Sequence, residues 1–298
     1  METAELLKKV RKIEIKTKGL SNQIFSGEYH SAFKGRGMAF SEVREYQHGD
    51  DIRSIDWNVT ARFNHPYVKI FEEERELNVM LIVDVSGSGD FGTNKQFKRE
   101  LITELCAVVS FSAIQNNDKI GMILFSDKIE KFIPPKKGKS HILRIIRELI
   151  NFQPESRGTN VSVALQYLSN VIKKRSIAFL VSDFYDAAIA QPKKSALEDA
   201  MKIASKKHDL VALKISDKRE AELPDIGLIH FKDAETGKTI LIDTSEKSVR
   251  NLYFSQRMLR EQYLNALFSR CGVDKVELQT GQNYIQPLIT LFKKREKR

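Results

Sequence analysis

The chain has 298 residues, of which 41% are hydrophobic and 30% charged, with a formal net charge of +10. These proportions are ordinary for a globular protein that buries a core without disulfides. No segment approaches the roughly 20 consecutive apolar residues that cross a bilayer, so we do not expect a membrane-spanning helix. Cys106 and Cys271 stand in apolar, helix-like stretches and are interpreted as buried thiols. The N-terminus is a poor secretory signal, so we expect a cytoplasmic protein.

The positive charge is scattered rather than gathered into one patch. Basic residues cluster in residues 8–18, 131–139, 173–175, 202–207 and 293–298. None of these stretches interleaves aromatic and basic residues as a platform for single-stranded nucleic acid does. The pattern therefore favours solvated helix faces and an acidic protein partner over nucleic acid.

Residues 1–76 differ in texture from the rest of the chain. A short helix is predicted for residues 3–12, and a strand for residues 66–71. Between them, residues 26–62 are dense in glycine, charge and aromatic side chains, with little periodicity. We expect a small N-terminal extension rich in β and irregular structure.

From Leu77 onward strand and helix signals alternate, which is typical of a parallel sheet covered by helices. Strands are predicted at residues 77–83, 119–125, 129–133, 177–181 and 210–215, with a hairpin over 228–231 and 239–242. Helices are predicted at residues 95–114, 142–150, 161–172, 195–207, 245–269 and 284–294. The pattern indicates an α/β fold with a Rossmann-like, doubly wound, mostly parallel sheet over residues 77–245. Residues 246–298 are expected to form a helical segment packed on it.

Oxygen-bearing side chains follow two of the predicted strands. Asp84, Ser86 and Ser88 alternate directly after the first central strand, and Asp183 follows a second one. Thr159 precedes a predicted helix. Ligands of open α/β sheets bind beyond the carboxyl ends of the strands, so these five side chains form a candidate site. Carboxylate and hydroxyl oxygens suit Mg²⁺ first, with Mn²⁺ or Ca²⁺ as alternatives.

Each of these residues also has a simpler interpretation. Asp84 and Asp183 could cap the segments that follow them, and Thr159 could cap a helix starting at Asn160. The serines could be turn residues. Residues 87–92 match the dinucleotide pattern G-x-G-x-x-G, but the expected acidic residue about 20 positions further on is missing. The combination, in this order along the chain, favours the cation site.

At this point the sequence resembles a known family. The pattern Asp84-x-Ser86-x-Ser88, then Thr159 and Asp183, resembles the metal-ion-dependent adhesion site (MIDAS) of von Willebrand factor A domains. Residues 35–46 and 49–62, above all Gly-Asp-Asp-Ile-Arg-Ser-Ile-Asp-Trp, look like the signature of the bacterial domain-of-unknown-function family fifty-eight, DUF58. The resemblance covers about residues 25–245.

The resemblance implies a binding module rather than an enzyme. In such domains the serines bind the metal directly, the threonine directly or through water, and the aspartates mostly through water. An acidic side chain of the partner completes the octahedron. Family members are associated with AAA+ ATPases of the MoxR type, as adaptors or co-chaperones. One departure, Asp90 within residues 89–92, leaves the choice of ion open.

The charged signature near the N-terminus has two interpretations. Its members are Arg36, Arg44, Asp50, Asp51, Arg53, Asp56 and Arg62. They form either a salt-bridge network that ties this segment to the rest of the domain or a second surface that faces a partner. The candidate partner-binding residues are Arg36, Arg44, Asp50, Asp51, Arg53 and Asp90. Trp57 is expected to pack in a core. Two other functions stay open: a metal-dependent hydrolase such as a phosphoesterase, with Asp90 as its spare carboxylate, and a nucleic-acid-binding protein.

Overall fold

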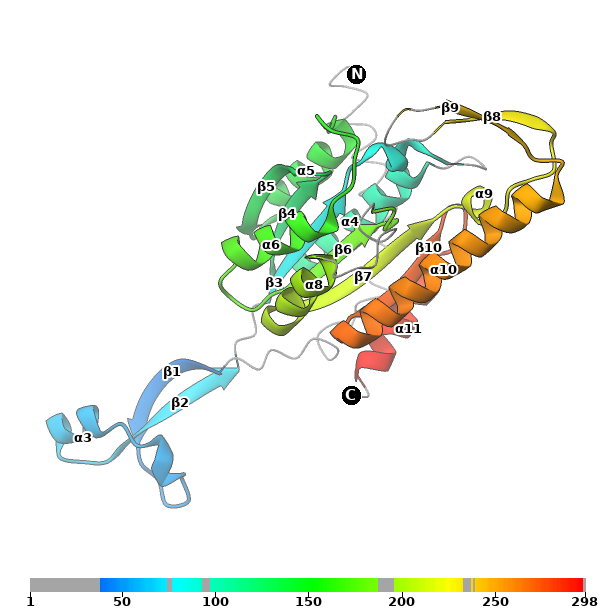
Figure 1. Cartoon of the computed structure of the whole chain (residues 1–298). Helices are drawn as coiled ribbons and strands as arrows, with labels where there is room; N and C mark the ends of the chain where they lie inside the picture. Colours follow the sequence, from blue (N-terminus) through cyan, green and yellow to red (C-terminus); the bar gives the residue numbers. More distant parts are fainter. Residues whose placement is uncertain are drawn as a thin grey trace.

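A six-stranded sheet forms the centre of the protein (Figure 1). The computed structural model describes residues 38–73, 77–92, 97–186, 196–232, 237 and 239–296. In spatial order the strands are β10 (Asp274–Gln279), β7 (Asp209–Ser216), β6 (Ile177–Ser182), β3 (Asn78–Asp84), β4 (Lys119–Phe125) and β5 (Ile129–Lys136). Neighbouring strands are parallel, except that β5 runs antiparallel to β4.

The apolar runs of the central strands explain their position in the sheet. Residues 79–84 of β3 and all of β6 are buried. A strand whose side chains are apolar on both faces needs a helical layer on each side, and parallel sheets provide this. The predicted α/β class with a mostly parallel sheet is confirmed.

Helices cover both faces of the sheet. One core contains side chains of α4 (Lys98–Gln115), α5 (Lys139–Asn151) and α11 (Ile285–Glu296), packed on Val79, Leu81 and Val83. The opposite core contains side chains of α6 (Val161–Val171), α8 (Ala196–Lys207) and α10 (Lys247–Cys271), packed on Met80 and Ile82. The alternation of β3 side chains between the two cores follows the two-residue period of a strand. Cys106 and Cys271 are buried free thiols, as predicted.

The C-terminal residues differ from the prediction of a purely helical segment. Residues 274–279 form β10, which pairs with β7 and becomes an outer strand of the main sheet. The predicted last helix is confirmed as α11. Residues 246–298 therefore contribute a strand to the sheet as well as helices that cover it.

The N-terminal arm, residues 38–73, lies away from the six-stranded sheet (Figure 1). Strands β1 (Met38–Glu45) and β2 (Tyr67–Glu73) pair antiparallel, and a short turn η1 (Ile52–Ser54) and helix α3 (Trp57–Phe63) lie between them. Trp57 is 66% exposed, so the prediction that it packs in a core is wrong. The helix predicted for residues 3–12 lies outside the described residues.

Three short elements complete the described chain. The turn η2 (Gly87–Asp90) follows β3, and helix α9 (Lys218–Ala221) follows β7. The predicted hairpin is confirmed as β8 (Leu228–Lys232) paired with β9 (Thr239–Asp243). Of the helices described, none combines the length and the apolar composition that crossing a membrane requires.

Candidate metal site

The predicted ligands come from three loops at the carboxyl edge of the sheet. Asp84 is the last residue of β3, and Asp183 directly follows β6, the parallel neighbour of β3. Thr159 stands in the loop that precedes α6. Because β3 and β6 run parallel and side by side, their ends bring both carboxylates to one place.

Two hydrogen bonds hold the loop of Thr159 against the other two loops. The amide of Gly87 donates to the carbonyl of Arg157 at 3.0 Å, which joins the serine loop to the threonine loop. The amide of Val161 donates to Asp186 Oδ2 at 3.0 Å, which joins the threonine loop to the segment after β6. The structure therefore brings together the three segments that carry all five predicted ligands.

The carboxylate of Asp84 is buried and held at both oxygens. Ser182 Oγ donates to its Oδ2 at 2.6 Å, and the amide of Ser86 donates to its Oδ1 at 2.9 Å. Burial, followed by the negative charge of Asp183, raises the pKa of Asp84 to about 7, although both hydrogen bonds act in the opposite direction. The cost of this second buried negative charge is relieved by either a proton or a cation at the site.

The two serine hydroxyls are spaced as neighbouring ligands of a small cation. Ser86 Oγ and Ser88 Oγ lie 3.0 Å apart and share a hydrogen bond. An octahedral Mg²⁺ with bonds of about 2.1 Å places adjacent oxygens about 3 Å apart. The spacing of the hydroxyls therefore fits Mg²⁺, or a cation of similar size, without rearrangement.

Thr159 is not the cap of the following helix. The N-cap of α6 is Asn160, whose side chain accepts a hydrogen bond from the amide of Val163 at 3.3 Å. Thr159 itself is only 6% exposed. The capping interpretation of Thr159 is therefore wrong, and its buried hydroxyl lies in a loop that contacts the serine loop.

A tight turn fixes Asp183. Its Oδ1 accepts from the amide of Tyr185 at 3.1 Å, and Ser182 Oγ accepts from the amide of Phe184 at 2.9 Å. Phe184 has a φ of 59°, in the left-handed region, a conformation that costs a residue with a side chain about 1 kcal/mol or more. Its fully buried ring packs edge-on against Phe268 at 5.2 Å. Packing of the ring offsets the backbone strain of the turn that follows Asp183.

Sequence reasoning missed Lys98, which lies beside this site. Its side chain is 1% exposed, and its Nζ lies 2.9 Å from Asp183 Oδ2. The ammonium also bonds the carboxylate of Glu220, and the rings of Phe91 and Tyr185 lie within 5.9 Å and 5.6 Å of it. Burial lowers the pKa of Lys98, but the charges of the two carboxylates outweigh it and hold that pKa above its usual value. The lysine is a fixed positive charge next to the predicted ligands.

One signal in the sequence could have identified Lys98. It is the first residue of α4, and Leu101, Ile102 and Leu105 stand three, four and seven positions after it. Residues at these spacings share one face of a helix, and these three face the core. A lysine in register with buried leucines needs a buried acidic partner.

The donor set fits a small, hard divalent cation. It offers two carboxylates and three hydroxyls, which are oxygen ligands of the type that Mg²⁺ and Mn²⁺ bind. Within the described ranges, no group of three or more His, Cys, Asp and Glu side chains is placed to hold a metal. Any ion here would therefore depend on hydroxyls, and two carboxylates leave it with room for an outside ligand.

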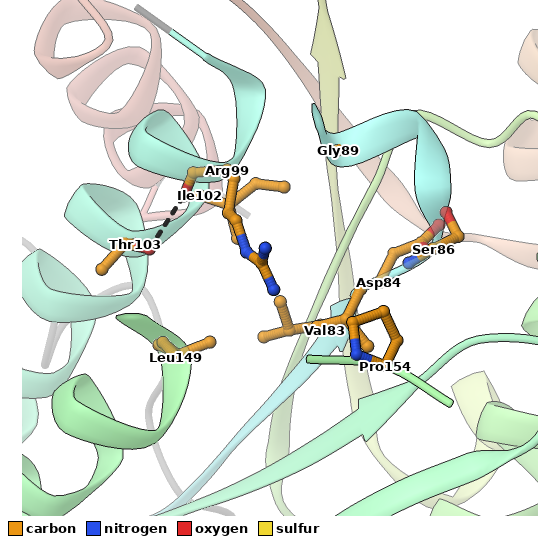
Figure 2. Close-up of a pocket in the computed structure, with 10 residues that line it drawn as sticks. Val83, Asp84, Ser86, Gly89, Arg99, Ile102, Thr103, Leu149 and Pro154 are labelled. Atoms are coloured by element: carbon orange, nitrogen blue, oxygen red, sulfur yellow. Dashed lines mark hydrogen bonds between the residues drawn. The ribbon is translucent and has the colours of Figure 1, made fainter. Parts of the chain in front are cut away.

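A small cavity opens beside Asp84 on the side of α4 and α5 (Figure 2). The side chain of Arg99 extends from α4 toward the end of β3, where Val83 and Pro154 lie. Its guanidinium donates to the carbonyl of Phe152. The cavity thus combines an apolar wall with a positive charge next to the candidate site.

The acidic residues of the N-terminal signature serve the arm itself. Arg44 makes a two-pronged ion pair with Asp50, at 2.8 Å and 2.7 Å. Asp51 caps η1, and Asp56 caps α3 and pairs with Lys69 at 3.4 Å. These contacts all lie within the arm and build its turns, so for these residues they do not form the predicted network that ties the segment to the rest of the domain.

The remaining members of the signature are placed differently. Arg53 and Arg62 are exposed, and neither side chain has an ion-pair partner among the described residues. Arg36 lies outside the described residues, as does the side chain of Asp90, whose backbone forms part of η2. A partner-facing role of the signature therefore stays a prediction, as does the use of Asp90 as a catalytic carboxylate.

Comparisons with known proteins identify a family and several similar chains. Residues 42–263 match the family described as "Protein of unknown function DUF58". Uncharacterized protein Rv1480 of Mycobacterium tuberculosis H37Rv is 25% identical over 299 residues, which are 100% of this chain and 92% of that protein. An aerotolerance-related membrane protein from Bacteroides fragilis superposes with a TM-score of 0.51 at 15% identity, over 74% of this chain and 98% of its own. The VWA domain of SpRpn10 superposes with a TM-score of 0.37 at 11% identity, over 72% and 94%.

Proposed function

The chain belongs to the DUF58 family of proteins of unknown function, and we propose that it is a metal-ion-dependent protein-interaction module. It binds an acidic side chain of its partner through a divalent cation held by Asp84, Ser86, Ser88, Thr159 and Asp183. Mg²⁺ is the proposed ion, because the spacing of the serine hydroxyls matches its bond lengths.

One observation supports this proposal: hydrogen bonds join three loops that are distant in sequence and that carry the five side chains. Ser182 bonds Asp84 at 2.6 Å, and Gly87 bonds Arg157 at 3.0 Å. Hydrogen bonds of this kind fix the loops before any ligand arrives, so binding costs little ordering. A site built only from caps and turn residues has no reason to gather three loops.

Each side chain has a distinct part in the proposed binding. Ser86 and Ser88 offer adjacent hydroxyl oxygens, and Thr159 offers a third from the neighbouring loop. Asp84 and Asp183 supply the negative charge that attracts the ion. The bound cation supplies a positively charged position that accepts one carboxylate from outside. Arg99, in the cavity beside Asp84, adds a positive charge that favours an acidic partner segment.

The proposed partner is an AAA+ ATPase of the MoxR type, which the chain would serve as an adaptor or co-chaperone. This part rests on the family resemblance, and the net charge of +10 is compatible with an acidic partner surface. We propose binding rather than catalysis.

Removal of Asp84 tests the proposal directly. We expect Asp84→Ala to abolish Mg²⁺ and Mn²⁺ binding in isothermal titration calorimetry and to leave the fold intact, because the change also removes a buried like charge beside Asp183. The matched control is Asp118→Ala. Asp118 is buried at the opposite end of β3, where it accepts from the amide of Leu77 at 2.9 Å. Unchanged metal affinity in Asp84→Ala contradicts the proposal.

A second measurement tests the role in partner binding. The purified chain and a MoxR-type ATPase are mixed with Mg²⁺, and the titration is repeated with a chelator. We expect binding with metal, and a loss of binding with chelator or in Asp84→Ala. Equal affinity in all three conditions would show that the interaction does not run through the cation.

A further inference from the structure

We propose that Lys98 is a built-in competitor of the divalent cation: it neutralises Asp183 while the site is free of metal and thereby lowers the metal affinity. This inference rests on the proposed function of the same site. It assigns Lys98 a task that none of the five predicted ligands performs, namely setting the ion concentration at which the module becomes able to bind.

The contacts of Lys98 are those of a counter-ion. Its ammonium lies 2.9 Å from Asp183 Oδ2, and the two side chains are 1% and 3% exposed. Its second acceptor is the carboxylate of Glu220, which is 18% exposed. A buried lysine is costly unless it is paired, and a buried carboxylate carries the same cost. Each charge of the pair therefore makes the burial of the other acceptable.

The balance of charge explains why a cation and Lys98 compete. Asp183 and Glu220 both pair with the Lys98 ammonium, and Asp84 lies close enough to Asp183 for their charges to interact. A divalent ion held between Asp84 and Asp183 would bring two positive charges close to Lys98. The ion and the Lys98 ammonium would repel each other strongly, because solvent screens charges only weakly in a buried environment. Metal uptake must therefore overcome the attraction between Lys98 and Asp183 as well as this repulsion.

Glu220 provides the alternative acceptor that makes the exchange feasible. Its Oε2 accepts from the amide of Asp217 at 3.1 Å, within the capping box of α9. Its carbonyl accepts from the hydroxyl of Tyr253, in α10, at 3.0 Å. The carboxylate is thus fixed in place, and it keeps Lys98 paired when a metal takes over Asp183. Removing Glu220 leaves Lys98 with Asp183 alone.

The proposal predicts opposite effects for two substitutions of neighbouring residues. Lys98→Met keeps a long apolar side chain in the core and removes the competing charge, so it tightens Mg²⁺ and Mn²⁺ binding on the order of ten- to a hundredfold. Glu220→Gln removes the alternative acceptor and weakens metal binding severalfold. Lys98→Arg keeps the positive charge, so its metal affinity stays closer to that of the wild type than the affinity of Lys98→Met. A purely structural lysine predicts the reverse for Lys98→Met, because a damaged site binds metal less tightly.

Lys214→Met is the matched control. Lys214 is also buried, at 5% exposure, and lines the cavity that Asp183 borders. Its ammonium pairs with Glu261 and lies 3.5 Å from Glu277, and neither of these carboxylates is one of the predicted ligands. This variant tests whether the loss of any nearby buried positive charge is enough to tighten metal binding. We expect a much smaller shift in affinity than Lys98→Met gives.

The experiment is a calorimetric titration of metal-free full-length chain with MgCl₂ and with MnCl₂, alongside thermal unfolding with and without each ion. Lys98→Met should also show the larger metal-induced rise in unfolding temperature, since stabilisation grows with affinity. Wild-type binding with equal or weaker binding by Lys98→Met overturns this inference and leaves the proposed function standing. No binding by any variant overturns the proposed function itself.

Two further outcomes decide the question where the first variant is difficult. If Lys98→Met folds only when metal is added, the metal has replaced the missing counter-ion, which supports the inference. If Lys98→Met does not fold under any condition, Glu220→Gln decides: weaker metal binding supports the competition, whereas unchanged or tighter binding contradicts it.

Discussion

Buried polar side chains in this protein differ in how far they are satisfied. Those at the candidate metal site are paired with one another, as in Asp183 with Lys98. His208, directly before β7, is fully buried, and neither ring nitrogen has a hydrogen-bond partner among the described residues. Burial, helped by the charges of Lys207 and Arg175, lowers the pKa of His208 to about 4. The folded protein therefore holds His208 in its neutral form.

His208 should make the protein sensitive to mild acid. Its pKa lies below the value of about 6.5 for an unfolded chain, so the unfolded state binds the proton first. The contribution of neutral His208 to the free energy of unfolding is fully present above pH 6.5. It is lost as the pH drops toward 4, by at most about 3 kcal/mol. We expect His208→Leu to remove this loss. Urea unfolding of both proteins at pH 7 and pH 5 measures it, and an equal acid-induced loss in both would contradict the assignment.

The residues of the candidate site differ in how visible they are in the sequence. The five predicted ligands could be found because each stands beside a predicted strand end or helix start, where local pattern and position agree. Lys98 was missed because its partners are far away along the chain: Asp183 is 85 positions away and Glu220 is 122. Local periodicity shows that a side chain faces inward but carries no information on what it meets there.

At the scale of elements, long apolar strands and amphipathic helices were predictable, and short or exposed ones were not. The strand β10 alternates polar residues with Val276 and Leu278, and only these two are well buried. That alternation was present in the sequence, but two apolar positions predict a strand only weakly, and the segment directly follows a long predicted helix. In the arm, η1 and α3 begin at aspartate caps within a charged stretch, where hydrophobic periodicity has little to detect.

The arm offers an optical test of its own exposure. Trp57, the chain's single tryptophan, is 66% exposed on α3. We expect its fluorescence to resemble that of a hydrated indole and to be quenched readily by acrylamide in the native protein. Blue-shifted, protected emission would instead place Trp57 in a core, as its sequence alone suggests. Because tryptophan and arginine are enriched at binding hot spots, a blue shift that appears only with a partner would locate an interface here.

A related substitution tests whether the arm is an independent unit. Asp56 accepts from the amides of Asn58 at 3.0 Å and Val59 at 3.3 Å, and so caps α3. Asp56→Ala should cost the arm about 1 kcal/mol. We expect hydrogen exchange to speed up in residues 57–73 and to stay unchanged in β3 and β6. Faster exchange in the central strands would show that the arm and the sheet unfold together.

At the scale of the whole molecule, residues near the C-terminus complete the sheet. β10 pairs with β7 along its whole length, and α11 packs into the core that α4 and α5 also share. Arg295 of α11 bonds Asp209 at 2.5 Å and Asp274 at 2.7 Å, which ties the starts of β7 and β10 together. The final helix therefore holds the outer strand in place.

A chain that stops at residue 272 should expose the outer edge of β7. Its apolar residues from Leu210 to Ile215 would stand next to unpaired backbone groups. We expect this truncated chain to aggregate during expression, and light scattering and size-exclusion chromatography to show it. A monomeric truncated chain with full secondary structure would mean that β10 and α11 are dispensable.

The same feature sets the order in which the protein can be made. Residues 274–296 are synthesised only after every other described strand. Each new chain therefore passes through a stage in which the outer backbone edge of β7 is unpaired and exposed. During that interval we expect the nascent protein to bind chaperones, because an unpaired strand edge is prone to aggregate. Pairing of β10 with β7 thus also determines when a newly made chain loses its exposed strand edge and, with it, this tendency to aggregate.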